Sequence, residues 1–371
     1  MRKVLKIFLI GTSFMVCGSE GVSGATITGS ASIIFTGNLR LDSALNDQIG
    51  VAFDKAMFDA NESIAKYSDQ RDLARGFGNA SVFSSQAATF QGLQNYSKIA
   101  VATGVMLGVQ APSFDPNYYD GIEDDIEVNG DVYAGVGVGV SLLNVGVTAN
   151  SIRPGLYLNF MFGSVSLNPT DDINVSTTLI GVGVNYTLAK PKSGSFLLKW
   201  RGLSVGSGLI YHSSNITLAL ELDSFSENFL VNQPGVLIGG TIDVDPSLLL
   251  ELKSKTVTIP LDITTSIQAL QLLNFALGTG IDFNMGKTDI IVTADGDIAV
   301  SNINDPGALI QTVTPGLVSV DGSTKGVSPS FARLRIMSGL GFNFGPAKLD
   351  IPIRYYFGAG ASFGLTAGVV F

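Results

Sequence analysis

The sequence predicts an all-β fold, a transmembrane outer-membrane β-barrel of ten to fourteen antiparallel strands with an N-terminal helical or loop plug segment. Charged residues make up only 14% of the 371 residues, whereas a typical soluble domain has about 25%. No run of about 20 apolar residues occurs beyond the extreme N-terminus, so spanning helices are not expected. Long segments instead alternate between apolar residues and small or polar ones, which is the pattern of a strand with two different faces.

The first 24 residues are typical of a signal peptide. A basic start with Arg2, Lys3 and Lys6 precedes an apolar core, and small residues follow just before Ala25. A lipoprotein signal ending at Cys17 is the alternative, although the residues before Cys17 are a poor context for lipidation. Because Cys17 is the only cysteine, the mature chain is expected to have no disulfide and no cysteine-based zinc site.

Residues 25–96 are predicted to form a plug, or hatch, inside the barrel. Apolar residues at helical spacing predict one helix at about 42–66, with Asp42 as its cap. A small and polar stretch with scattered aromatic residues follows this helix. The residues expected to line the hatch are Phe77, Asn79, Phe83 and Phe90.

Residues 97–371 are predicted to form the barrel, because the apolar pattern here has a period of two. Most alternating segments run for 10 to 15 residues, longer than the mean soluble strand of about 5 to 6 residues and sufficient for a tilted membrane strand. Two excursions, 213–255 and 286–330, contain further strand-like runs that could raise the count to twelve or fourteen. The ten expected strands are 99–110, 132–142, 155–166, 175–188, 196–212, 256–267, 271–285, 331–345, 347–357 and 361–371.

The two faces of the expected strands differ in polarity. In the last strand, Phe363 and Leu365 alternate with Ser362, Gly364 and Thr366. Charged residues occupy the second face of other strands, so the apolar face is expected to meet lipid and the polar face an aqueous bore. The charged residues expected in the bore are Lys199, Arg201, Arg333, Arg335, Asp350 and Arg354.

Two roles are open for these bore residues. Arg333, Arg335 and Arg354 come from strands expected to pair, and guanidinium groups grip a carboxylate or phosphate head group with two parallel hydrogen bonds. In the structural alternative, Asp350 neutralises one arginine, or the arginines bind the plug or set an ion preference. Trp200, between Lys199 and Arg201, is expected at a membrane interface.

No enzyme activity, cofactor or metal site is expected. The only histidine, His212, lies beside Ser213 and Ser214, but its place at the end of an expected strand favours an interfacial or loop residue over a catalytic base. The acidic run at 120–131 lacks the spacing of a calcium loop. The repeat "GVGVGV" is no phosphate-binding loop, since neither a helix nor a lysine follows it. Its small bore-facing glycines are expected to leave room for the plug.

The layout resembles the FadL family of outer-membrane transporters for long-chain fatty acids and other hydrophobic molecules. The stretches "GNASVFSSQAATFQGLQNYSKIAVATGVMLGVQAPS" and "LLKWRGLSVGSGLIY" are similar to diverged spirochaete members. This resemblance implies fourteen strands with the N-terminal segment folded inside as a hatch. The family's Asn-Pro-Ala hatch motif is absent, and Asn79-Ala80 is its nearest counterpart. The terminal Phe371 resembles the signal read by the barrel assembly machinery.

The expected function is passive uptake of small hydrophobic solutes, such as long-chain fatty acids, across a bacterial outer membrane. Its expected partners are outer-membrane lipid, the hydrophobic ligand and the assembly machinery. Nucleic acid is not expected, because the net charge is -9 and phosphate binding needs clustered basic residues. The alternatives are a porin for hydrophilic solutes, a structural or adhesive surface barrel and a secreted soluble β-protein.

Overall fold

The computed structural model describes residues 70–87, 98–111, 134–191, 197–221, 224–233, 236–304 and 316–371. The chain forms two compact units. The barrel unit comprises Arg71–Ile216, Leu252–Asp289 and Lys325–Phe371, and the second unit comprises Met1–Gln70, Thr217–Glu251 and Ile290–Thr324. The predicted signal peptide, the predicted helix at 42–66 and the acidic run at 120–131 lie outside the described residues.

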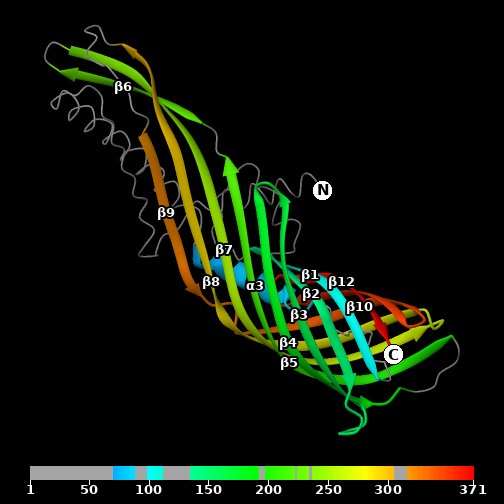
Figure 1. Cartoon of the computed structure of the whole chain (residues 1–371). Helices are drawn as coiled ribbons and strands as arrows, with labels where there is room; N and C mark the ends of the chain where they lie inside the picture. Colours follow the sequence, from blue (N-terminus) through cyan, green and yellow to red (C-terminus); the bar gives the residue numbers. More distant parts are fainter. Residues whose placement is uncertain are drawn as a thin grey trace. The chain divides into compact units, whose positions relative to one another are not determined.

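One helix and twelve strands make up the described chain (Figure 1). In a strand, side chains on successive residues point to opposite faces of the sheet. Segments in which apolar residues alternate with small or polar ones therefore form strands. In chain order the elements are α3 (Gln70–Ser84), β1 (Ile99–Gln110), β2 (Gly135–Thr148), β3 (Leu156–Thr170), β4 (Ile173–Ala189), β5 (Leu198–Glu221), β6 (Phe225–Gln233), β7 (Val236–Ala269), β8 (Leu273–Asn304), β9 (Gly316–Val327), β10 (Ala332–Phe344), β11 (Ala347–Tyr356) and β12 (Gly360–Val370).

Ten of these strands close into a ring. The hydrogen-bonded order runs β7-β5-β4-β3-β2-β1-β12-β11-β10-β8, and an additional β7–β8 pairing closes it. The first and last strands of the barrel, β1 and β12, are antiparallel neighbours over Ala100–Gln110 and Gly360–Val370. Each of the ten predicted segments is one of these strands, and the predicted antiparallel barrel is therefore confirmed.

The two excursions do not add strands to the ring within the described residues. Their strand-like runs are mostly continuations of β5, β7 and β8, and β7 and β8 alone are 34 and 32 residues long. Only β6 and β9 are separate strands, and they occupy the two ends of the sheet order. The fourteen strands implied by the FadL resemblance are thus wrong for this ring, because the alternating pattern continues through the runs without a turn.

The barrel wall has an apolar exterior and a polar interior. Phe363 and Leu365 are 52% and 45% exposed, whereas Ser362 and Thr366 between them are each 1% exposed. The charged Arg335 and Asp282 are completely buried. The predicted orientation of the two strand faces is therefore confirmed, and this closed antiparallel arrangement is the architecture of a transmembrane β-barrel.

The ring has two different ends. At the first, here called the turn end, Phe371 ends the last strand and its carbonyl accepts a hydrogen bond from the Lys98 amide at 2.9 Å. Neighbouring strands are joined there by the segments 149–155, 270–272 and 345–346. At the opposite loop end, β1 stops at Gln110 and β2 begins at Gly135, and the chain turns at 171–172 and 357–359.

The second unit contains the short strand β6. In it β6 pairs antiparallel with β7 from Phe225 opposite Val244 to Gln233 opposite Val236. The Asp243 carboxylate accepts hydrogen bonds from the hydroxyls of Ser226 and Ser301. These bonds hold the pKa of Asp243 below its usual value. Among the helices that the structure describes, none is long and apolar enough to cross a membrane.

Candidate functional site

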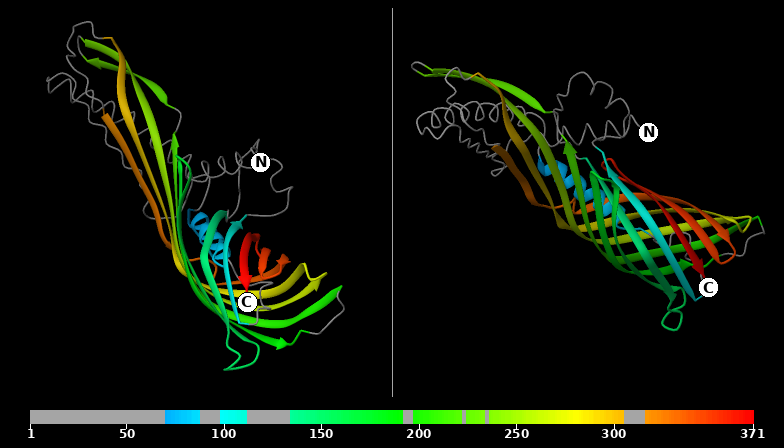
Figure 2. Two further views of the ribbon diagram at one scale, coloured as in Figure 1. Left: turned by 45° about the vertical axis from the view of Figure 1, so that its right-hand side comes forward. Right: turned by 45° about the horizontal axis from the view of Figure 1, so that its top comes forward.

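The helix α3 lies inside the ring of strands, as both views of Figure 2 show. Its first residue in the barrel unit, Arg71, is exposed, but every residue from Gly76 to Ala87 is buried. The helix sequence is rich in small residues, among them Gly76, Gly78 and Ala80 near its middle. Burial on all sides is possible because these residues let the helix backbone approach the wall closely.

Three inward-facing glycines form the part of the wall nearest to the helix backbone. A Cβ atom added at Gly108 or Gly137 would collide with the Ala80 carbonyl, and one at Gly139 with the Ser84 carbonyl. We call Gly108, Gly137 and Gly139 the glycine wall. The prediction that the small residues of "GVGVGV" leave room for a plug is confirmed by these contacts.

Two of the predicted hatch aromatics pack against this side of the bore. Phe77 is 1% exposed, and its backbone lies against Gly135. Phe83 is stacked on Tyr356 of β11, with ring centroids 3.9 Å apart and ring planes 18° from parallel. Phe90 lies outside the described residues.

The predicted hatch residue Asn79 joins the helix to the loop end of the barrel. Its amide nitrogen donates a hydrogen bond to Gln110 Oε1 at 3.3 Å, and its amide oxygen accepts one from the Ser330 backbone N–H at 2.8 Å. Because Asn79 is buried, breaking either bond would leave a polar group without water to replace its partner. Asn79 therefore anchors the helix.

His212 provides a second anchor, and its predicted place at an interface or in a loop is wrong. The strand β5 continues past it to Glu221, so His212 faces the bore and is completely buried. Its Nδ1 is 2.9 Å from Ser81 Oγ of α3, and its Nε2 is 2.9 Å from Thr177 Oγ1 of β4. In a hydrolase triad one ring nitrogen of the histidine faces a serine hydroxyl and the other faces a carboxylate. Both ring nitrogens of His212 face hydroxyls instead, and this geometry suits anchoring of the helix.

A group of charged residues holds the chain just after the helix. Arg335 Nη1 donates to Gln86 Oε1 at 2.7 Å, and Gln86 Nε2 donates to the two oxygens of Asp282 at 3.1 and 3.2 Å. Arg335 also forms ion pairs with Asp282, at 3.0 Å, and with Asp262. We call Arg335, Asp282 and Asp262 the charged wall. Of the roles left open by the sequence, binding of the plug is the one that Arg335 has here.

The three arginines of β10 and β11 have different surroundings, although these strands pair as predicted. Arg354 is 2% exposed, contacts Met106 Sδ at 3.4 Å and lies within electrostatic range of Asp262 and Asp282. Arg333 instead reaches across the loop end, donating to the Phe357 carbonyl at 2.9 Å and to Ser330 Oγ at 2.8 Å.

The expected neutralisation of an arginine by Asp350 is not what the described residues show. The charged neighbour of Asp350 is Lys348, and Lys348 also donates a hydrogen bond to Asn343. The acidic partners of Arg335 come instead from β7 and β8. Alternation placed Asp350 correctly in the bore, but it carries no information on which strand faces which across the lumen.

Lys199 and Arg201 lie near the start of β5, at the turn end. Lys199 is exposed and Arg201 is half-buried, within electrostatic range of Lys348. Trp200 between them donates a hydrogen bond to Thr265 Oγ1 at 2.8 Å. The predicted bore residues thus divide into Arg333 at the loop end, the group around Arg335 and Arg354, and a turn-end group.

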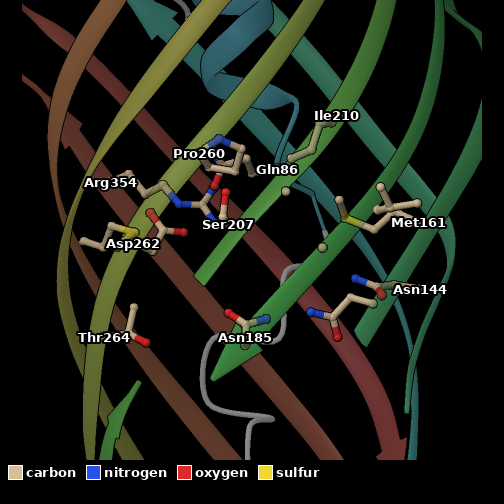
Figure 3. A pocket seen from close by; sticks show the side chains of 15 residues that line it. Gln86, Asn144, Met161, Asn185, Ser207, Ile210, Pro260, Asp262, Thr264 and Arg354 are labelled. Carbon is tan, nitrogen blue, oxygen red and sulfur yellow. The ribbon is translucent and has the colours of Figure 1, made fainter. Parts of the chain in front are cut away.

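A cavity of about 70 Å³ remains in the bore beside the charged wall (Figure 3). Since a water needs roughly 10–15 Å³ of such space, the cavity has room for several waters. Its wall combines amide, charged and apolar side chains, among them Gln86, Asn144, Asn159, Met161, Ile210, Asp262 and Arg354. Within the described residues, no three His, Cys, Asp or Glu side chains gather as a metal site.

Sequence reasoning missed Gln86 and Asp262, which complete the site. Asp262 alternates with the outward-facing Leu261 and Ile263, so strand parity could have placed it in the bore. Gln86 follows the helix in a stretch without a clear period, and the sequence contains no signal that singles it out.

Solved structures similar to this chain are bacterial barrels. The translocator domain of the autotransporter NalP from Neisseria meningitidis has a TM-score of 0.27 and 10% identity, covering 75% of this chain and 90% of that one. A Pseudomonas aeruginosa FadL homologue has a TM-score of 0.24 and 10% identity, covering 82% and 98%. The P. putida toluene transporter TodX has a TM-score of 0.23 and 9% identity, also covering 82% and 98%. FadL homologues therefore recur among the similar structures, but at such TM-scores these likenesses support no functional assignment.

No curated protein matches the chain. A family model described as Lsa36-like matches residues 29–371, which includes every described residue of the barrel. The chain belongs to the Lsa36-like family.

Proposed function

We propose that the protein is a channel of the bacterial outer membrane that is closed in this conformation and admits small hydrophobic or amphipathic solutes when the plug shifts. The observation that carries the proposal is the position of α3, which lies in the bore and leaves a cavity of about 70 Å³ beside it. Such a space has room for several waters.

The surface of the ring supports its placement in a membrane. Large apolar side chains such as Phe160, Phe162 and Ile180 are about half exposed on the outside of adjacent strands. In water these side chains would form a large exposed apolar surface, which soluble monomers avoid. In a bilayer the same surface meets acyl chains at no such cost.

The lining of the cavity supports an amphipathic solute. Met161, Val182 and Ile210 offer an apolar surface, and the Arg354 guanidinium lies in the same lining. A guanidinium binds a carboxylate strongly when water is excluded. A long-chain fatty acid, with one carboxylate and an apolar tail, matches this combination once movement of α3 lengthens the cavity.

The hydrophilic porin is the weaker candidate. It requires the N-terminal segment to lie outside the lumen, yet the described residues from Phe77 to Ala87 are buried against inward-facing strand residues. A structural or adhesive role for the surface loops would need no bore at all, and the anchoring groups inside the bore would then have no gating task.

Native mass spectrometry of the purified protein with oleate is the direct test. We expect one bound fatty acid for the wild type and at least tenfold weaker binding for Arg354→Gln, whereas the exposed-site variant Lys190→Gln should bind as the wild type does. Retained heat-resistant barrel migration on a gel would show that each variant is folded. Conductance to ions and sugars without any fatty-acid binding would contradict the proposal.

A further inference from the structure

Asp262 is the member of the charged wall that still faces open space. Its Oδ1 pairs with Arg335 and lies against Gly280, where an added Cβ atom would collide with this oxygen. Even so, the Asp262 side chain is 22% exposed, whereas the side chains of Arg335 and Asp282 are completely buried. Because Asp262 lines the cavity, its exposed surface is available to a molecule in that space.

Arg354 occupies the same side of the cavity as Asp262. Figure 3 shows the Arg354 guanidinium close to the Asp262 carboxylate, with Asn144 and Met161 on the opposite side. The two charged groups also lie within electrostatic range of each other. The cavity therefore presents a cation and an anion to the same end of a bound solute.

The formal charges of the residues at this side of the bore cancel. Arg335 and Arg354 are positive, Asp262 and Asp282 are negative, and all but Asp262 are at most 2% exposed. A solute with a carboxylate alone would add an uncompensated negative charge to this buried group, and Asp262 would repel it. A hydrogen-bond donor beside the solute carboxylate would instead make Asp262 a binding partner.

We propose that the solute of this channel is a carboxylate that carries a hydrogen-bond donor, a hydroxyl or an ammonium, on the carbon atom next to the carboxylate. The solute carboxylate accepts hydrogen bonds from the Arg354 guanidinium, and the donor binds the Asp262 carboxylate while Asp262 Oδ1 keeps its pairing with Arg335. The proposal rests on the channel function proposed above and narrows its substrate class.

The uncharged part of the cavity lining supports a solute with more than one polar group. Asn159, Asn185 and Ser207 line the same space as the charged pair. A site lined by hydrogen-bonding groups rejects an analogue that lacks the matching group, because its own polar atoms then lose water without gaining a partner. Met161 and Ile210 leave an apolar part of the lining for the rest of the solute.

Native mass spectrometry with three matched acids tests this inference. The probes are hexadecanoate, 2-hydroxyhexadecanoate and 2-aminohexadecanoate, which share one chain length and differ only at the carbon next to the carboxylate. We expect the wild type to bind the hydroxy or the amino acid roughly tenfold more tightly than hexadecanoate, which is about the factor that one hydrogen bond to a charged group supplies. The two substituted acids show which donor the site takes.

The discriminating variant is Asp262→Asn. Its amide keeps an oxygen that can accept from Arg335, but the charge that repels a lone carboxylate is gone. We expect this variant to bind hexadecanoate more tightly than the wild type does and to lose the preference for the substituted acids, a gain that misfolding cannot produce. Asp171→Asn removes the same charge at an exposed position of the loop end and should keep the preference of the wild type.

The outcomes separate this inference from the proposed function. If neither substituted acid binds the wild type more tightly than hexadecanoate, or if Asp262→Asn keeps the preference, the inference is overturned, and the channel proposal stands as long as oleate binds. Binding of none of the acids, oleate included, would contradict the proposed function as well.

Discussion

The glycine wall and the charged wall hold the same segment of chain by different means. Gly108, Gly137 and Gly139 approach the helix so closely that no side chain fits between the two backbones. Arg335 and Asp282, on another part of the ring, hold the single side chain of Gln86 through hydrogen bonds and an ion pair. One contact depends on shape alone, and the other on a few directional bonds.

Under the proposed channel function, the difference indicates which side of the bore would open. Close packing against a backbone offers no alternative partner, and a gap of roughly 0.5–1 Å already loses about a quarter to a half of the van der Waals attraction. A hydrogen-bonded charge group can exchange Gln86 for water or for a solute carboxylate while Arg335 keeps its two aspartates. The cavity lies beside the charged wall. We infer that the helix moves away from this wall and stays against the glycines.

The largest expected effect follows from breaking the charged wall with Arg335→Leu. This variant leaves Asp282 buried without its cation, and removal of one partner from a buried ion pair costs about 3–5 kcal/mol. Urea unfolding followed by the fluorescence of Trp200, the only tryptophan, measures the loss in the free energy of unfolding.

Two further variants complete this test. Lys190→Leu alters an exposed residue and should change stability by less than about 0.5 kcal/mol. The double variant Arg335→Leu with Asp282→Leu should recover part of the loss, because the completely buried charge of Asp282 is then removed together with that of its partner. If Arg335→Leu were as stable as Lys190→Leu, the charged wall would not hold the plug.

Most of the barrel can be predicted from the sequence, because a strand alternates strictly between lipid and bore. Counting residues assigns Phe363 and Leu365 to the outside and Arg335 and Arg354 to the inside, and their exposure agrees. Local periodicity settles the face of each residue and the existence of each strand.

Contacts across the lumen could not be predicted in this way. Arg335 of β10 pairs with Asp262 of β7, which lies two strands away in the ring. The sequence pattern of neither strand predicts this contact, because the contact depends on the number of strands in the ring and on their stagger. The continuation of β5 past His212 was missed because the pattern alone does not show where a strand ends.

An intermediate effect is expected from filling the glycine wall with Gly137→Val. The added side chain collides with the backbone at Ala80, and overpacking of this kind costs typically about 1–3 kcal/mol. Because the helix must shift, single-channel recordings in a planar bilayer should show a larger and more frequent conductance than in the wild type. Val138→Leu, at the neighbouring outward-facing position, should leave both stability and conductance unchanged, and an equal effect of both variants would refute the wall's role.

The smallest expected effect comes from the anchor that lies outside both walls. In Thr177→Val the side chain keeps its shape but no longer meets His212 Nε2 at 2.9 Å, which leaves a buried ring nitrogen without this partner. Loss of such a bond costs about 1 kcal/mol.

Thr178→Val is the matched control, since Thr178 shares only an exposed hydrogen bond with Ser164. Urea unfolding of the two variants should therefore differ by about 1 kcal/mol. Equal unfolding curves would mean that the hold on α3 comes from the two walls alone, and that His212 only fills space beneath Ser81.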